Sequence, residues 1–184
     1  MQIIKNTFFT ISLLLVVTSL LAIEVDKNES YIQFSGVQNK KTAFQGRFEN
    51  FEPIIIFDEE DLENSSITVF VDLASVNSHS EKRDAMLKNA NWFDVESMPK
   101  GKFESNKIVP LEGEKYRVYG VLTLRNISKP IELLMQIRKN KNLINFSGKY
   151  TLNRLDFELG LGAWKNPDWV KHEVEIQYQV IIKK

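Results

Sequence analysis

Residues 75–103, SVNSHSEKRDAMLKNANWFDVESMPKGKF, contain the one compact helical pattern in a chain that otherwise alternates as β-strands do. Ser78 and Glu81 have the spacing of a capping box, in which a hydroxyl is followed three residues later by a carboxylate. This spacing predicts one short, charged helix near residues 79–90.

An aromatic pair follows the predicted helix directly. Trp92 and Phe93 come just after it, and Pro99 then prevents the helix from continuing. Large apolar side chains beside a short charged helix are well placed to close the end of a hollow sheet. The stretch therefore predicts a container rather than a catalyst.

Outside this stretch, apolar and polar residues alternate with a period of two, which is typical of strands with two different faces. Segments 67–73, 116–124 and 174–182 are clear examples. Residues 111–114 and 140–142 read as hairpin turns, and Asn126 to Pro130 as a slightly longer one.

Short turns imply antiparallel neighbours, and a strongly twisted sheet of this size tends to close on itself. We therefore expect an all-β fold, an extended antiparallel, lipocalin-like barrel of about eight strands with one short helix. A β-sandwich is the alternative.

The beginning of the chain has the pattern of a secretory signal peptide. Lys5 precedes an almost wholly apolar run over residues 8–21, which is too short to span a bilayer comfortably. We expect cleavage after Ala22, a signal peptide over residues 1–22, one barrel domain over 23–184 and no integral membrane span after cleavage. An uncleaved anchor is the alternative, because Leu20 is larger than the small residue usual at that position. The expected location is periplasmic or secreted.

The charges of the chain are balanced, with 24 Lys and Arg against 24 Asp and Glu. Lys5 is the only charged residue before Glu24, so the expected mature chain carries a net charge of −1. A balance near zero argues against nucleic acid, or an anionic membrane, as an electrostatic partner. The chain has no cysteine, so no disulfide supports the fold.

Few residues offer catalytic or metal-binding chemistry. His79 and His172 are the only histidines, and both fall at the ends of predicted elements. The acidic run Asp58–Asp61 lacks the alternating spacing and the glycine of a calcium loop, which favours a solvated turn. We expect no metal, no cofactor and no catalytic residue.

Two arginine-containing pairs, Arg83-Asp84 and Asn153-Arg154, are better candidates for function. The neighbours of Arg154 are apolar, so inside a barrel its charge needs a compensating partner. The leading interpretation is a buried ion pair of Arg154 with Asp84 or Asp156. Contact with a ligand headgroup and simple exposure are the alternatives.

The aromatic content exceeds what the packing of a small barrel requires. Most of these side chains are expected in the core, but an apolar tunnel with one polar end would also accept an isoprenoid or acyl chain. The residues are Phe34, Phe44, Phe48, Phe51, Phe70, Trp92, Phe93, Phe103, Phe146, Phe157 and Trp164.

The order of segments resembles the YceI-like family of polyisoprenoid-binding, lipocalin-like periplasmic proteins. After the export signal the matching segments are EVDKNESYIQF, FQGRFENF, VDLASVNSHSEKRD, LKNANWFDVESMPKGKF, VYGVLTLRNISKPIEL, LNRLDF and HEVEIQYQV. The resemblance implies a barrel around a tunnel, and binding, transport or storage of a long isoprenoid. It implies no catalytic residues.

Matched residue by residue, the resemblance marks Arg83-Asp84, Phe93-Asp94 and Asn153-Arg154 as family pairs. The sequence departs from the family pattern at three positions. Ser78 replaces a threonine, and Asn126 and Glu158 each replace a glycine. The two lost glycines put the local backbone at those positions in question.

Together these observations predict a carrier or store for a long-chain polyisoprenoid or quinone-like lipid, with a homodimer left open. The alternatives are an enzyme in which Arg83 and Arg154 clamp a polyprenyl diphosphate, and a ligand-free, stress-related structural module. The predicted ligand contacts are Phe34, Phe44, Phe48, Arg83, Asp84, Trp92, Phe93, Phe103, Leu122, Phe146, Asn153, Arg154 and Phe157.

Overall fold

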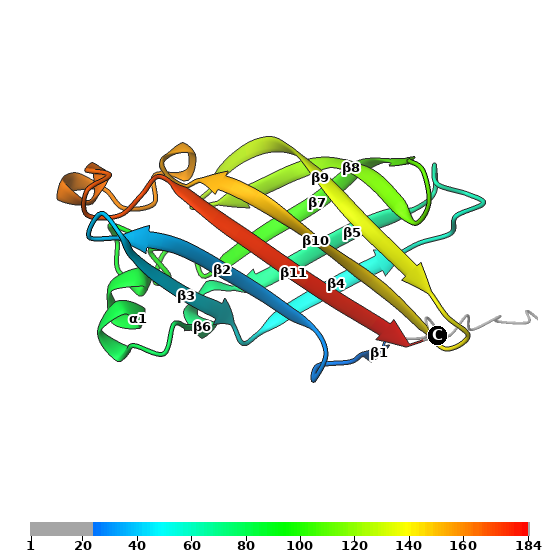
Figure 1. Ribbon diagram of the computed structural model, residues 1–184, viewed down its shortest axis with the longest axis horizontal. Helices are drawn as coiled ribbons and strands as arrows, with labels where there is room; N and C mark the ends of the chain where they lie inside the picture. Colours follow the sequence, from blue (N-terminus) through cyan, green and yellow to red (C-terminus); the bar gives the residue numbers. More distant parts are fainter. Residues whose placement is uncertain (1–23, 184) are drawn as a thin grey trace, which may run out of the picture.

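Antiparallel strands make up most of the computed structural model, which describes residues 24–183 (Figure 1). The predicted signal peptide lies outside the described residues. The strands are β1 (Glu24–Val25), β2 (Tyr31–Gln38), β3 (Thr42–Phe48), β4 (Phe51–Ile56), β5 (Ser66–Asp72), β6 (Val76–Asn77), β7 (Lys100–Pro110), β8 (Lys115–Leu124), β9 (Ile127–Lys139), β10 (Leu143–Asn153) and β11 (Glu173–Lys183). One α-helix, α1 (Glu81–Lys88), and three 3₁₀ turns, η1 (Leu73–Ser75), η2 (Arg154–Phe157) and η3 (Gly162–Lys165), complete the described fold.

The strands form one curled sheet with the order β4-β5-β7-β8-β9-β10-β11-β2-β3-β6, and β1 adds to β11. Every ladder is antiparallel. The structure has eleven strands where about eight were expected. The difference arises because β3 leads into β4, and β5 into β6, across short breaks in the ladder. If β3 and β4 are counted as one interrupted strand, β5 and β6 as another, and the short β1 is left out, the barrel has eight strands. The predicted lipocalin-like barrel is therefore confirmed.

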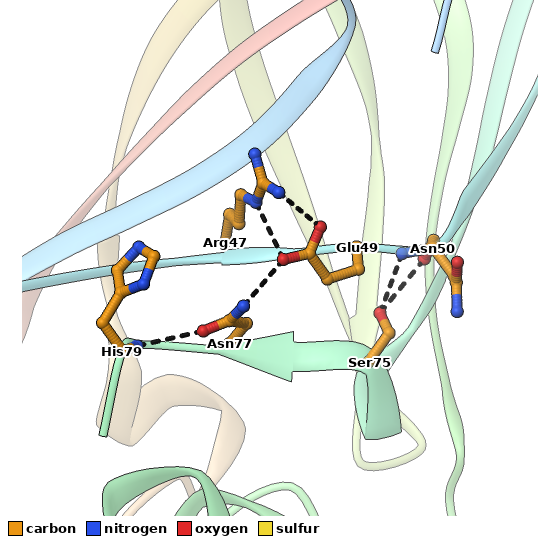
Figure 2. A network of polar contacts seen from close by, with 6 residues as sticks. All are labelled: Arg47, Glu49, Asn50, Ser75, Asn77 and His79. Atoms are coloured by element: carbon orange, nitrogen blue, oxygen red, sulfur yellow. Dashed lines mark hydrogen bonds and ion pairs between the residues drawn. The ribbon is translucent and has the colours of Figure 1, made fainter. Parts of the chain in front are cut away.

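The sheet comes full circle at residues 47–50, where β3 passes into β4 across Glu49 and Asn50. Figure 2 shows the polar network that ties this bend to β6. The Arg47 guanidinium contacts both carboxylate oxygens of Glu49, at 2.9 and 2.7 Å, and Asn77 Nδ2 donates to Glu49 Oε1 at 2.8 Å. The backbone N–H of Asn50 donates to Ser75 Oγ at 3.0 Å. The hydrogen bond from Arg47 is the main cause of a lowered pKa at Glu49.

The helix begins two residues later than the predicted capping box implied. Ser80 is the N-cap, and its hydroxyl accepts from the backbone N–H of Arg83. The Ser78–Glu81 capping box is therefore wrong. The reason is the left-handed backbone of His79, with φ of 56°, which turns the chain between the two serines. Ser78 instead donates its N–H and hydroxyl to Asp84 Oδ1, at 2.8 and 2.6 Å.

The expected turns over 111–114 and 140–142 connect β7 to β8 and β9 to β10. The longer turn expected over Asn126–Pro130 is wrong, because only Arg125 and Asn126 leave the ladder and residues 127–130 already pair with β8. Both turn residues have positive φ, 50° and 58°, as a tight two-residue hairpin requires. Asn126 adopts this backbone in place of the family's glycine.

The barrel has two distinct ends (Figure 1). Helix α1, the β2–β3 turn and the segment between β10 and β11 gather at one end, which we call the helix end. The β4–β5 loop and the β7–β8 and β9–β10 turns gather at the other, which we call the far end. In the described residues, no helix is both long and apolar enough to cross a membrane.

Candidate functional site

An apolar cavity of about 210 Å³ lies within the barrel and reaches both of its hydrophobic core clusters. Most of its strand-borne lining consists of residues that point inward with a period of two. Examples are Ile67, Val69 and Val71 of β5 and Leu133 and Met135 of β9. The alternation that is typical of the strands therefore gives the closed sheet an apolar interior.

Four phenylalanines form a connected series at the helix end of the cavity. The ring centroids of Phe34 and Phe44 are 6.5 Å apart, those of Phe34 and Phe48 are 5.5 Å apart, and those of Phe48 and Phe93 are 5.7 Å apart. Gly46 makes this packing possible, since a Cβ there would lie 2.5 Å from the Phe34 ring. Gly46, which lies between Phe44 and Phe48 in the sequence, therefore leaves the space that the Phe34 ring occupies.

Helix α1 and the residues after it line the same end of the cavity through Arg83, Met86, Leu87, Trp92 and Phe93. Trp92 and Phe93 are buried, in agreement with their predicted place at the end of the sheet.

The Arg83 guanidinium lies 5.4 Å from the centre of the Phe44 ring and donates to the Ser78 carbonyl at 3.1 Å. Arg83 and Asp84 therefore both hold Ser78, one through its carbonyl oxygen and the other through its N–H and hydroxyl. Arg83 also keeps a cation at the cavity wall.

Arg154 is 1% exposed, and a set of backbone carbonyl oxygens surrounds its guanidinium. Nε donates to Lys171 at 3.0 Å. One terminal nitrogen donates to Leu159 and Gly160, and the other to Trp164 and Val170. All five N–H donors of the side chain are thereby used.

The predicted ion pair of Arg154 with Asp84 or Asp156 is therefore wrong. Asp84 binds Ser78, and Asp156 is exposed. The ring of Trp92 adds a cation–π contact to Arg154 at 5.4 Å. Burial lowers the pKa of Arg154, because no carboxylate compensates the desolvation of its charge.

Ten of the thirteen predicted ligand contacts line the cavity. They are Phe34, Phe44, Phe48, Arg83, Trp92, Phe93, Phe103, Leu122, Phe146 and Arg154. The other three do not belong to its lining. Asp84 holds Ser78, Asn153 caps η2 by accepting from the Leu155 N–H at 3.1 Å, and Phe157 packs in the core cluster at the helix end.

Sequence reasoning emphasised aromatic residues and missed most of the aliphatic lining. Val174, Ile176 and Val180 of β11 belong to the cavity wall, as do Ile131 and Leu133 of β9. The period-two pattern that predicted these strands already placed such residues on one face. That face was the signal that could have identified them.

Aromatic rings pack the far-end side of the cavity, and the cavity wall also contains one buried hydroxyl. Phe57 makes edge-to-face contacts with Tyr116 and Phe146, with centroids 5.4 and 5.6 Å apart. Tyr178, which lines the cavity, has a buried hydroxyl without a hydrogen-bond partner. Its burial raises the pKa of Tyr178, and burial also raises the pKa of Tyr150 on the same wall.

Within residues 24–183, no group of three or more His, Cys, Asp or Glu side chains could hold a metal ion. The acidic run Asp58–Asp61 lies in the β4–β5 loop. There Asp58 Oδ1 accepts from the Glu60 N–H at 3.0 Å, and Ser65 Oγ donates to the Asp61 carbonyl at 2.9 Å. These bonds build a solvated turn.

The comparisons with known proteins agree with this architecture. A UPF0312 protein of Photorhabdus laumondii subsp. laumondii is 31% identical over 148 residues, which cover 76% of this chain and 77% of the relative. BcnA of Burkholderia cenocepacia has a TM-score of 0.82 at 25% identity and covers 86% of this chain and 99% of its own.

A polyisoprenoid-binding domain from Saccharophagus degradans has a TM-score of 0.70 at 16% identity over 89% of this chain and 98% of its own, which shows a shared fold. The model of the YceI-like domain matches residues 24–182, nearly all of the described chain. The chain therefore belongs to the YceI-like family.

Proposed function

We propose that this protein binds a long-chain apolar lipid, a polyisoprenoid or quinone-like molecule, within its barrel and carries or stores it. The observation that supports this most directly is the cavity, whose wall is mostly apolar and draws its residues from both core clusters of the barrel. Burial of each methylene group contributes about 0.8 kcal/mol, so a long chain binds tightly without a catalytic group. The polyisoprenoid-binding name of the Saccharophagus degradans neighbour supports the same ligand class.

The cavity volume of about 210 Å³ is smaller than the roughly 300–1,000 Å³ of most ligand pockets. A long chain therefore enters with part of its length or displaces side chains of the lining. Arg83 is placed to meet a polar headgroup, because it lines the cavity while its neighbour Asp84 is occupied by Ser78. The predicted signal peptide supports action in the periplasm or outside the cell.

The hydrogen bonds of Arg154 favour binding over catalysis. The enzyme alternative requires Arg83 and Arg154 to clamp a diphosphate, but every N–H donor of Arg154 is already bound to a carbonyl oxygen. A clamp would have to break those bonds within a buried site.

Solvent extraction of the natively purified protein, followed by mass spectrometry of the extract, tests the proposal. We expect a co-purifying polyprenyl or quinone-like lipid, and uptake of a short-chain isoprenoid by lipid-free protein. A protein that carries no lipid and takes up no isoprenoid would contradict it. Turnover of a polyprenyl diphosphate that is lost in Asp84→Asn while binding is retained would instead support the enzyme. Fractionation of cells that express the full chain tests its location.

A further inference from the structure

The near-zero net charge of the chain conceals two local clusters of like charge, one at each end of the barrel. At the far end, the β4–β5 loop carries five exposed carboxylates over residues 57–65 and no lysine or arginine. At the helix end, the β2–β3 turn and residues 162–171 carry four exposed lysines and one aspartate. These lysines are Lys40, Lys41, Lys165 and Lys171.

Trp169 lies among these lysines and is 53% exposed, one of the few large apolar side chains on the surface. The backbone fixes it beside the β2–β3 turn. The N–H of Asn39 donates to the Trp169 carbonyl at 2.9 Å, and the N–H of Lys40 donates to the Asp168 carbonyl at 3.0 Å. An indole combines a large apolar surface with one polar N–H, which suits it to the boundary between lipid and water.

The surface formed by Lys40, Lys41, Lys165, Trp169 and Lys171, here the tryptophan face, adjoins residues of the cavity wall. Val170 follows Trp169, is buried and lines the cavity, and it pairs with Gln38, which also lines it. Alternation along this short segment thus directs one residue to the interior and its neighbour to the solvent.

Lys40 occupies a backbone position that suits glycine better. Its φ is 68°, in the left-handed region where a Cβ is strained. Its ammonium pairs with Asp168 at 3.6 Å, but its side chain remains 74% exposed. A charged residue is therefore presented to solvent at a site where the fold alone would favour glycine.

We propose that the tryptophan face docks on the surface of an anionic lipid bilayer, with the acidic β4–β5 loop turned away. The lysines match anionic headgroups in charge, Trp169 enters the interfacial region, and the cavity wall begins directly behind them. This partner goes beyond lipid binding itself, and it gives the barrel an orientation in which its helix end meets the source of lipid.

Vesicle binding by the purified, lipid-free protein tests the proposal. The probes are vesicles of phosphatidylcholine alone and vesicles that also contain phosphatidylglycerol, at low and at high salt. We expect stronger binding to the anionic vesicles, and loss of that preference at high salt, because surface charges are then screened. Lipids brominated near the headgroup should quench tryptophan emission in the wild type but not in Trp169→Phe.

Two pairs of variants localise the effect. Lys40→Gly should weaken binding to anionic vesicles about fivefold without lowering the melting temperature, since glycine relieves the left-handed backbone. Lys141→Gly removes the same charge from a far-end turn and should leave binding within about twofold. Trp169→Ser should weaken binding about tenfold, whereas Ile56→Ser, at an exposed far-end residue, should not.

Several results would overturn the proposal: no binding of the wild type to either vesicle, equal binding to both, or equal losses in the far-end variants. A concentration-dependent dimer that Trp169→Ser abolishes would assign the tryptophan face to a second copy of the chain. Uptake of a short isoprenoid from solution needs no bilayer. Retained uptake with absent vesicle binding would therefore reject the docking surface and leave the proposed lipid binding intact.

Discussion

Arg154 holds the segment between β10 and β11 in place, since its donors reach carbonyl oxygens from Leu159 to Lys171. Arg154→Met should lower the free energy of unfolding by about 3–5 kcal/mol, because several buried carbonyls lose their partner at once. Arg154→Lys should recover only part of this, since three donors on a flexible stem cannot replace a planar fork of five. Urea denaturation measures both changes.

Arg138→Met is the matched control, because Arg138 forms an exposed pair with Glu114 on the outer wall. It should change stability by less than about 1 kcal/mol. Hydrogen exchange in Arg154→Met should accelerate between residues 159 and 171 before it does so in the strands. Uniform acceleration across the whole sheet would show that Arg154 supports the barrel rather than this segment.

Because of Tyr178, we expect the stability of the folded protein to depend on pH in the alkaline range. Its buried, unpaired hydroxyl has a raised pKa, so above about pH 10 the unfolded chain loses this proton while the folded chain retains it. Stability is therefore fully present below about pH 10 and falls as the pH rises further. Tyr178→Phe should flatten this fall and should not destabilise the protein at neutral pH. Thermal melts from pH 8 to 11 measure the effect, and an unchanged slope in Tyr178→Phe would contradict it.

At the scale of elements, η2 ends in a strained cap. Glu158 follows it with φ of 55°, and its N–H donates to the Leu155 carbonyl at 3.1 Å. Glu158→Gly should raise the free energy of unfolding by about 1 kcal/mol, because glycine has no Cβ to clash in the left-handed region. Glu158→Ala removes the same charge but keeps the Cβ, so it should give no gain. Equal stabilisation by both variants would show that charge, not backbone, governs this position.

The sequence predicted the strands well because their period-two pattern is local, and it marked the turn at Gly113 for the same reason. The start of α1 was harder to predict. Ser78 and Ser80 are both acceptable caps, and the choice between them depends on the left-handed backbone of His79 and on Asp84 accepting from Ser78. The partners of Arg154 could not be inferred either, since backbone carbonyls carry no sequence signal and meet the side chain only after the segment up to Lys171 folds over it.

At the scale of the whole molecule, the barrel sorts residues in two directions. Across its wall, alternation places apolar side chains inside, which follows from the sequence pattern. Along its axis, the β4–β5 loop gathers carboxylates at the far end, whereas the β2–β3 turn and residues 162–171 gather lysines at the helix end, and this depends on which segments share an end (Figure 1). Net charge alone cannot reveal the second arrangement, because it sums over both ends.

The interior alternation also provides a test of the cavity that separates binding from folding. Val69 of β5 lines the cavity, whereas its neighbour Thr68 does not. Val69→Trp should place an indole in the open space and reduce uptake of a short isoprenoid more than tenfold. Overpacking of a full core usually costs about 1–3 kcal/mol, but here the cavity can absorb part of the added volume, so the loss of stability should lie at the lower limit. Thr68→Trp adds the same side chain to the same strand outside the cavity and should retain uptake. Fluorescence titration with a short isoprenoid measures uptake, and urea denaturation measures the stability of both variants. Equal uptake by Val69→Trp and the wild type would place the lipid outside the barrel.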